Sequence, residues 1–388
     1  MLYKLSDIFD LQMGKTPSRD NNMYWQDGNL PWVSIADLSK SQIYIENSKE
    51  MITNLAVKDT LMKCIPQDTV IMSFKLSLGK TAITRTPLYT NEAIMAFIDK
   101  KVIKIEPKYI YFLFRYIKWG QYTNNAVKGK TLNKKFFSDF QINIPGYIQQ
   151  KKIVSILIRI NKTLEYKHSL IKAYDALIKS RFVEMFGNPI INDKKYPVFK
   201  LKDISQKIGS GVTPRGGDSN YIDKGVAFIR SMNVYNNTFK KENLVYIDES
   251  LAKQLCQVEL FSNDLLLNIT GASVARCCTV PDDILPARVN QHVCIIRQCR
   301  ISNVFLEYCL TNESYQEYLL LLSNKNGATR EALTKIQVEN LEVIFPPLTE
   351  TTRFVKIVHQ INKLKSDVQK SIDETQLLMD SLMQEYFG

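Results

Sequence analysis

A stretch of 36 residues that occurs twice constrains this chain more than any other feature of its sequence. Residues 152–187 reappear, at a constant offset of 201, as residues 353–388. In both copies apolar residues follow one another at steps of three and four, the pattern of a helix that buries a narrow seam. Each copy ends in Phe-Gly, and a glycine often closes a helix. The sequence therefore predicts two matched helices of about 54 Å each. The predicted seam positions are Ile153, Leu157, Ile160, Leu164, Ile171 and Ile178 in the first copy and Phe354, Val358, Ile361, Val368, Ile372 and Leu382 in the second.

The segments before the two helices are also related to each other. Residues 4–8 (KLSDI) correspond to 200–204 (KLKDI), and residues 14–17 (GKTP) correspond to 211–214 (GVTP). Further matches follow in the same order along the chain. The sequence thus reads as a tandem duplication of a module and a helix, with predicted bounds 1–151 for the first module, 152–187 for the central helix, 188–196 for a linker, 197–352 for the second module and 353–388 for the C-terminal helix.

Short apolar runs in each module alternate with Gly, Pro and Asn, and one longer run in each is typical of a helix, which together indicate an α+β fold. The helix at 152–187 leads from the first module to the second. The helix at 353–388 has a matching seam that needs a partner, so we expect the two helices to form an antiparallel coiled coil. The duplication then becomes a pseudo-twofold axis. Apolar residues beside the seams, which suggest docking by other subunits, are Ile156, Leu170, Leu177, Phe182, Ile357, Leu364, Leu377 and Phe387.

Composition places the chain among globular proteins. Of its 388 residues 45% are hydrophobic and 23% are charged. The sequence shows neither a signal peptide nor an apolar run long enough to span a membrane, which predicts a cytoplasmic location. Its seven cysteines are an odd number and favour reduced thiols. A zinc site formed by His292, Cys294 and Cys299 is an alternative, but the spacing matches no usual structural zinc pattern.

The net charge of +12 favours a polyanionic partner, and it is distributed unevenly. Residues 1–151 contain 21 basic and 13 acidic side chains, whereas residues 197–352 contain 16 and 17. Bulk charge therefore predicts nucleic-acid contact by the first module. The second module would need a local basic patch.

The sequence contains no complete form of the catalytic motifs considered below. A phosphate-binding loop needs a glycine five residues before its Gly-Lys pair, but Phe9 and Phe74 occupy those positions. The adenine clamp of a methyltransferase and the clustered carboxylates of a metal nuclease are not formed by any stretch of the sequence. With three histidines in the whole chain, general-base chemistry is also poorly supplied.

The remaining candidates are basic and amide side chains in loops. Arginine commonly reads guanine and glutamine reads adenine, whereas lysine more often holds phosphate. The alternative for any one of these residues is an ordinary solvated surface position. Lys80 and Arg276 stand at equivalent positions of the repeat. The predicted DNA contacts are Lys15, Arg19, Lys75, Lys80, Arg85, Lys128 and Lys130 in the first module and Arg215, Arg230, Arg276, Arg288, Gln291 and Arg330 in the second.

These features together resemble a known family. Two modules that open near Lys-Leu-x-Asp-Ile and Gly-x-Thr-Pro, each followed by an apolar strand, a proline and a long helix ending in Phe-Gly, resemble the specificity subunit of type I restriction–modification systems. The resemblance covers essentially the whole chain. It implies that each module is a target-recognition domain for one half of a bipartite, asymmetric double-stranded DNA site, and that the helices set the spacer between the halves.

The resemblance also implies partners. Two methylation subunits, which bring S-adenosylmethionine, and two restriction subunits, which bring ATP and Mg²⁺ chemistry, would assemble on this chain, which itself needs no cofactor and catalyses nothing. Two alternatives stay open at this stage. One is a DNA-modifying enzyme with an unrecognised active site, and the other is a coiled-coil scaffold without a nucleic-acid role.

Overall fold

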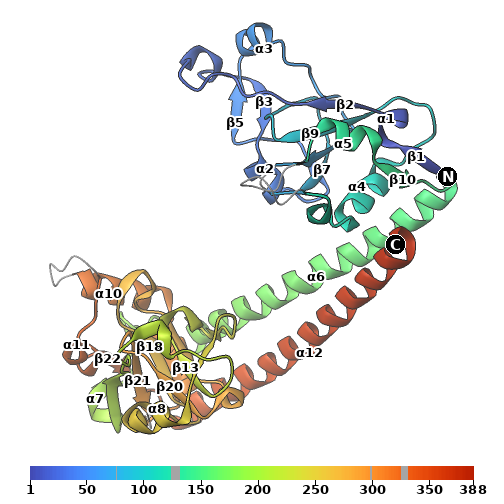
Figure 1. The fold of residues 1–388 in the computed structure, drawn as a ribbon. Helices are drawn as coiled ribbons and strands as arrows, with labels where there is room; N and C mark the ends of the chain where they lie inside the picture. Colours follow the sequence, from blue (N-terminus) through green and yellow to red (C-terminus); the bar gives the residue numbers. More distant parts are fainter. Residues whose placement is uncertain (76, 124–131, 298, 325–330) are drawn as a thin grey trace. The chain divides into compact units, whose positions relative to one another are not determined.

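The computed structural model describes residues 1–75, 77–123, 132–297, 299–324 and 331–388. The chain divides into two compact units: unit 1 consists of residues 1–168 and 370–388, and unit 2 of residues 169–369. Each unit combines an α+β module with a part of both long helices (Figure 1). The predicted α+β class is therefore confirmed.

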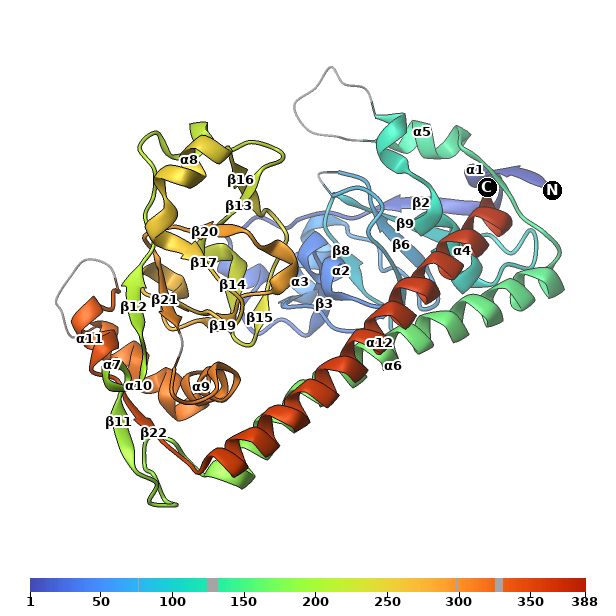
Figure 2. The same ribbon diagram turned by 90° about the horizontal axis from the view of Figure 1, so that it is seen from below.

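Two helices of 40 residues each, α6 (Tyr147–Phe186) and α12 (Leu348–Phe387), pack against each other in both units. In unit 1 the first half of α6 packs through Ile153 and Leu157 against the last turns of α12 at Leu382. In unit 2 the last turns of α6, at Phe182, pack against the start of α12, at Phe354. The helices thus run in opposite directions within each unit (Figure 2), as predicted.

Both helices begin five residues earlier than the expected starts at 152 and 353. The reason is the same in both repeats. A proline follows the preceding strand, at Pro145 and Pro346, and the helix starts two residues after it. Their first turns are partly exposed, with Ile148 and Leu348 accessible to 74% and 72%, so they add nothing to the apolar seam from which the starts were predicted.

The seam positions are not uniformly covered. Ile153, Leu157, Leu164, Ile178, Phe354, Val358, Ile361 and Ile372 are buried, whereas Ile160, Ile171, Val368 and Leu382 are half-buried. Of the apolar residues expected beside the seam, Ile156, Leu177, Leu364 and Leu377 are exposed. Phe182 is instead fully enclosed among the aromatic rings of Phe186, Phe305 and Phe354 in the core of unit 2. Its helical spacing could not reveal this because the covering residues come from the module.

Unit 1 contains two main sheets with strand orders β2-β9-β6-β7-β4 and β5-β3-β8, and a separate pair, β1-β10. The strands are β1 (Leu2–Lys4), β2 (Phe9–Met13), β3 (Leu30–Val33), β4 (Tyr44–Ile45), β5 (Glu50–Ile52), β6 (Val70–Ser73), β7 (Thr81–Thr84), β8 (Tyr89–Thr90), β9 (Ile94–Asp99) and β10 (Gln141–Asn143). The shorter helices are α1 (Leu5–Ile8), α2 (Ile35–Lys40), α3 (Asn54–Thr60), α4 (Pro107–Tyr116) and α5 (Lys134–Asp139).

Unit 2 has main sheets with orders β12-β21-β18-β19 and β16-β13-β20-β17, and the pairs β14-β15 and β11-β22. The strands are β11 (Val198–Lys200), β12 (Lys207–Ser210), β13 (Val226–Ile229), β14 (Val234–Tyr235), β15 (Thr238–Phe239), β16 (Val245–Ile247), β17 (Glu259–Leu260), β18 (Leu265–Asn268), β19 (Cys277–Thr279), β20 (Ala287–Val289), β21 (Val293–Arg297) and β22 (Glu342–Ile344). The shorter helices are α7 (Leu201–Ile204), α8 (Glu249–Gln254), α9 (Asn303–Leu310), α10 (Glu313–Asn324) and α11 (Lys335–Glu339).

The two units share one strand topology. The order β2-β9-β6-β7 in unit 1 corresponds to β12-β21-β18-β19 in unit 2, and β5-β3-β8 corresponds to β16-β13-β20. In both units the central strand of the second sheet, β3 or β13, has one antiparallel and one parallel neighbour. A clear difference follows β13: unit 2 has the short hairpin β14-β15, where unit 1 has the helix α2 and the strand β4.

Candidate nucleic-acid interface

The Gly-x-Thr-Pro segment forms the same turn in both units. The backbone N–H of Lys15 donates to the oxygen of Thr90 over 2.9 Å, and that of Val212 donates to the oxygen of Val289 over 3.0 Å. A Cβ atom on Gly14 would lie 2.1 Å from the oxygen of Thr90, and one on Gly211 would lie 2.1 Å from that of Val289. Only glycine permits so close an approach of two backbones. The turn thereby fixes the loops that carry Lys15, Arg19 and Arg215.

Two predicted contacts near this turn in unit 1 have protein partners. The ammonium group of Lys15 donates to the backbone oxygen of Thr60 over 2.8 Å, although the side chain stays exposed. The guanidinium of Arg19 forms a two-pronged ion pair with Glu50, with 3.0 Å between Nη2 and Oε2, and lies 3.9 Å from the ring centre of Trp25. The hydrogen bond to Glu50 raises the pKa of Arg19 further above its usual value. Arg19 therefore fastens its loop, and we leave it out of the proposed contact surface.

Three other predicted residues of unit 1 lie around strands β6 and β7. Lys80, in the loop between them, is exposed and makes neither a side-chain hydrogen bond nor an ion pair among the described residues. Lys75 lies 5.4 Å from the ring centre of the buried Phe74. Arg85 follows β7, packs over the ring of Tyr44 at 4.6 Å and lies 3.8 Å from the carboxylate of Glu46. Lys80 is thus the least engaged cation of the three.

In unit 2, Arg215 and Gln291 are exposed, and Arg230 is half-buried. Arg230 donates to the backbone oxygen of Asn243 over 2.7 Å, and its Cζ lies 5.3 Å from the ring centre of Tyr221. Arg276, between β18 and β19, lies 4.4 Å from the ring centre of Tyr235. Because Asn268 bonds Arg276 and Ser73 bonds Lys80 in the same backbone pattern, the structure supports the predicted equivalence of Lys80 and Arg276.

Arg288 does not fit the predicted contact surface, because its side chain is only 8% exposed. Its Nε donates to the backbone oxygen of Ala252 over 3.0 Å, and its Nη1 lies 3.1 Å from the carboxylate of Glu259. Strand β20 pairs with neighbours on both sides, so an inward-facing arginine there is enclosed. Arg288 therefore stabilises the sheet, and we withdraw it from the set of DNA contacts.

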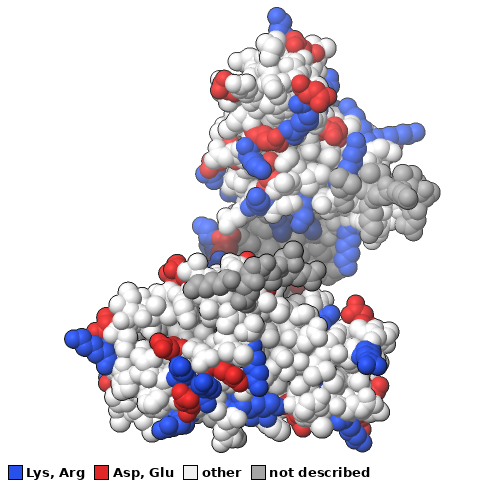
Figure 3. Space-filling view, turned by 90° about the vertical axis from the view of Figure 1, so that its left-hand side faces the viewer, with Lys and Arg blue, Asp and Glu red and all other residues white. Residues whose placement is uncertain are grey.

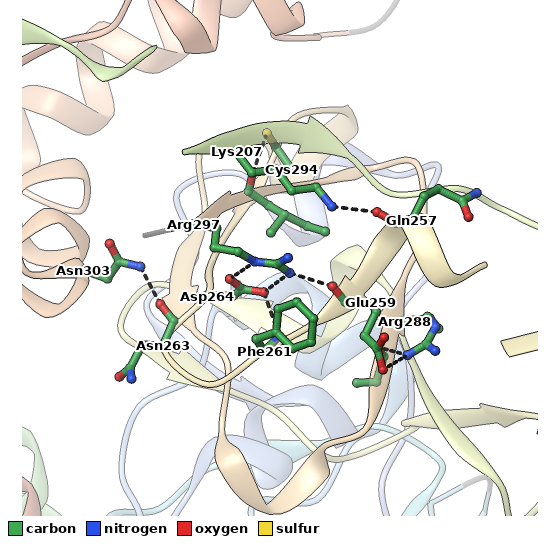
Figure 4. A network of polar contacts seen from close by, with 12 residues as sticks. Lys207, Gln257, Glu259, Phe261, Asn263, Asp264, Arg288, Cys294, Arg297 and Asn303 are labelled. Atoms are coloured by element: carbon green, nitrogen blue, oxygen red, sulfur yellow. Dashed lines mark hydrogen bonds and ion pairs between the residues drawn. The ribbon is translucent and has the colours of Figure 1, made fainter. Parts of the chain in front are cut away.

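A second arginine of unit 2, Arg297, is largely enclosed, with 13% of its side chain exposed, and was not singled out from the sequence. It is held in two prongs by the fully buried Asp264, at 2.7 and 2.6 Å, and also donates to the backbone oxygen of Glu259 (Figure 4). Its guanidinium lies 4.1 Å from the ring centre of Phe261. Burial lowers the pKa of the neighbouring Lys207, and the charge of Arg297 lowers it further. This network joins β17, β18 and β21 and is structural.

Lys128, Lys130 and Arg330 lie outside the described residues. Lys240, which sequence reasoning missed, lies 4.1 Å from the ring centre of Tyr235, the ring over which Arg276 also lies. The sequence did contain a signal for this position. Asn236-Asn237 is typical of a tight hairpin turn, and such a turn brings the chain, with Lys240, back toward Tyr235. Figure 3 shows Lys and Arg side chains interspersed with Asp and Glu on the visible face of the molecule.

His292 shares a hydrogen bond of 2.6 Å with Thr270, and Cys294 is buried in β21. Within the described ranges, we find no group of three or more His, Cys, Asp and Glu side chains arranged to hold a metal ion. None of the helices in the described part of the chain combines the length and apolar character that crossing a membrane requires.

Two α+β units of one topology, each containing a segment of both long helices, define a duplicated module-and-helix architecture. The family model of the type I restriction modification DNA specificity domain matches residues 1–173 and 193–375, which include both modules and the first part of each long helix. The chain belongs to this family and is the DNA specificity subunit of a type I restriction–modification system, the non-catalytic component. The predicted family and function are thereby confirmed.

Curated relatives support this assignment. The chain is 25% identical to the specificity subunit of the type I restriction enzyme MjaIX of Methanocaldococcus jannaschii, over 98% of this chain and 90% of the relative. It is also 29% identical to the specificity subunit of EcoR124I/EcoR124II from Escherichia coli, over 39% of both chains.

Solved structures show the same fold. A chain from a study of complex assembly and conformational transition of a type I system aligns over 100% of this chain and 97% of its own length, with a TM-score of 0.63 and 16% identity. The specificity subunit from M. genitalium aligns over 100% and 96%, with a TM-score of 0.56 and 11% identity.

Proposed function

We propose that each unit reads one half of a bipartite, asymmetric duplex DNA site. The observation that carries this proposal is the repeated Gly-x-Thr-Pro turn, in which Gly14 and Gly211 make the same close backbone approach and carry loops with different side chains. A shared frame with different loop residues is what two readers of unlike half-sites require. Lys15, Lys75, Lys80, Arg85, Lys128 and Lys130 are the proposed contacts of unit 1, and Arg215, Arg230, Arg276, Gln291 and Arg330 are those of unit 2.

The proposal assigns the paired helices α6 and α12 the role of spacer. Unit 1 and unit 2 each contain one segment of both helices, packed into the core of the respective module. In unit 2, for example, the ring of Phe186 lies 4.8 Å from that of Phe305 in α9. A helix that is continuous through both cores favours a defined separation of the half-sites.

The proposal also includes the partners. Exposed apolar residues on the helices, among them Ile156, Leu177, Leu364 and Leu377, favour docking of two methylation subunits, one for each repeat. Two restriction subunits would complete the complex. S-adenosylmethionine, ATP and Mg²⁺ belong to those partners, and the cytoplasmic location is part of the same proposal.

The spacer role is tested by inserting one heptad into each helix, at positions that keep the seams in register. A heptad lengthens a helix by about 10 Å, and the preferred spacer should therefore grow by about 3 base pairs at 3.4 Å each. Sequencing of methylated adenines in host DNA measures the spacer. A matched variant with two alanine substitutions at exposed helix positions, Lys162 and Lys363, keeps the length and should keep the spacer. An unchanged spacer in the insertion variant would contradict the assignment.

A further inference from the structure

Two cations of unit 2 lie over one aromatic ring. The ammonium nitrogen of Lys240 is 4.1 Å, and the guanidinium carbon of Arg276 is 4.4 Å, from the ring centre of Tyr235. Lys240 is exposed, and Arg276 and Tyr235 are half-buried, so solvent reaches the cluster. Both positive charges therefore lie over one solvent-accessible ring, in a module that has almost no net charge.

Three other arginines on aromatic rings in this chain are paired with a carboxylate, whereas Arg115 on Tyr111 and Arg230 on Tyr221 form no ion pair among the described residues. Arg19 on Trp25 is paired with Glu50, Arg85 on Tyr44 with Glu46, and Arg297 on Phe261 with Asp264. Neither Lys240 nor Arg276 forms an ion pair with any described residue. Two like charges on one ring repel each other, and an anion that binds both would relieve this repulsion. The cluster thus has the charge of an anion site without an internal counter-ion.

Side-chain hydrogen bonds hold the hairpin that carries Tyr235 in place. The side chain of Asn236 accepts from the backbone N–H of Cys277 over 3.1 Å and donates to Gln316 over 3.0 Å. Asn237 donates to Thr311 over 2.9 Å and to the buried carboxylate of Glu307 over 3.3 Å. Because Cys277 directly follows Arg276, these bonds hold the ring and the arginine backbone together. Such preorganisation lowers the entropy lost when a ligand binds.

A cavity of about 550 Å³ adjoins the cluster. Its lining includes Tyr235, Arg276, Ser231 and Ser273. Glu331 also lines it but makes no ion pair with Arg276 among the described residues. Hydroxyl and guanidinium donors around one concave surface are suited to phosphate oxygens, which arginine commonly binds in two prongs.

We propose that Lys240 and Arg276, held over Tyr235, form a clamp for one backbone phosphate of DNA. The clamp rests on the proposed DNA-reading function and supplies the local basic patch that residues 197–352, with 16 basic and 17 acidic side chains, lack as a whole. A phosphate contact positions the unit on the duplex and carries no base information itself. The neighbouring Arg230 and Gln291 remain available for base edges.

The clamp is tested with the full chain in its complex with the methylation subunits, bound to a short random-sequence duplex over a series of salt concentrations. Each of Lys240→Ala and Arg276→Ala should lower the affinity by about fivefold at physiological salt and reduce the slope of log affinity against log salt by about 0.9. The matched control is Lys241→Ala, since Lys241 is the next residue but is paired with Asp283. It should change neither quantity to that extent. Tyr235→Phe keeps the ring and should match the wild type, whereas Tyr235→Ala should behave like the two cation variants.

A competition with inorganic phosphate distinguishes a DNA site from a site for free anions. Equal salt slopes for Lys240→Ala, Arg276→Ala and Lys241→Ala would overturn the clamp, even if the wild-type complex binds DNA as proposed. Loss of inorganic-phosphate binding in Lys240→Ala without a change in the DNA slope would also overturn it and identify a free-anion site. A wild-type complex without salt-dependent DNA binding would refute the proposed function, and the clamp with it.

Discussion

Unit 1 and unit 2 have the same strand order but hold their surface arginines differently. In unit 1, Trp32 of β3 faces Glu50 of β5, and this glutamate neutralises Arg19. In unit 2 the corresponding strand pair places Val245 opposite Phe228, so no carboxylate stands at that position. In unit 1 both Arg19 and Arg85 are paired with a carboxylate. In unit 2 Arg288 and Arg297 are paired as well, but Lys240 and Arg276 are unpaired among the described residues. Net charge is therefore a poor measure of which unit presents cations to a ligand.

A second difference lies in the helix that packs against β7 in unit 1 and against β19 in unit 2, which is α4 or α9 respectively. Glu307 of α9 is enclosed and accepts hydrogen bonds from Thr279 and Asn237. The ring pair Phe186–Phe305 of unit 2 corresponds to Phe387–Tyr109 of unit 1, which places Tyr111 at the position of Glu307. Unit 2 thus contains a buried ionisable carboxyl where unit 1 contains a phenol. This comparison predicts that the two units respond differently to pH.

The largest effect is expected from Arg297→Ala in unit 2. Removing the arginine leaves the fully buried carboxylate of Asp264 without its partner, which costs about 3 to 5 kcal/mol in the free energy of unfolding. Denaturant titration of the purified chain measures it. A decrease in the free energy of unfolding of less than about 1 kcal/mol would show that the network of Figure 4 does not stabilise unit 2 as its burial indicates.

An intermediate effect is expected from Glu307→Gln. Burial raises the pKa of Glu307 above its unfolded value, so the folded state binds a proton more tightly than the unfolded state does. Stability is then greatest below the unfolded pKa of about 4.5 and falls as the pH rises toward the raised folded pKa. Each pKa unit corresponds to about 1.4 kcal/mol. In unfolding experiments at a series of pH values, the glutamine variant should lack this decline. If the glutamine variant kept the wild-type decline in stability with rising pH, ionisable groups other than Glu307 would cause that decline.

The smallest effect is expected from Arg19→Ala in unit 1. The ion pair with Glu50 is about half exposed, at 51% and 39%, and solvent screens it, so the free energy of unfolding should fall by less than about 1 kcal/mol. The salt slope of DNA binding should also stay within experimental error of the wild type. A slope reduced by about 0.9 would show that Arg19 exchanges Glu50 for a phosphate and would return it to the contact surface.

The sequence predicted the architecture because its signals repeat. The offset of 201 revealed the paired helices, and the matching Gly-x-Thr-Pro segments revealed the duplicated module. The fate of individual arginines could not be predicted in this way. Whether Arg288 is enclosed depends on strands β13 and β17 on either side of it, and whether Arg19 is free depends on Glu50, 31 residues further along the chain. Such partners are set by strand register, which the duplication does not encode.

The pairing of Tyr235 with two cations illustrates the same limit at short range. Lys240 is only five residues from Tyr235, but Arg276 reaches the ring because β14 and β15 lie against β19. The helix starts at Tyr147 and Leu348 were missed for a simpler reason, since an exposed first turn leaves no apolar period to detect.

The most direct test of the account is to exchange residues 1–151 for the corresponding module of a relative, such as the MjaIX specificity subunit, and to map methylated adenines in a host that carries the matching methylation subunits. Separate reading by two units predicts that one half of the methylated site changes, while the other half and the spacer stay as in the wild type. A change in both halves of the site would contradict it.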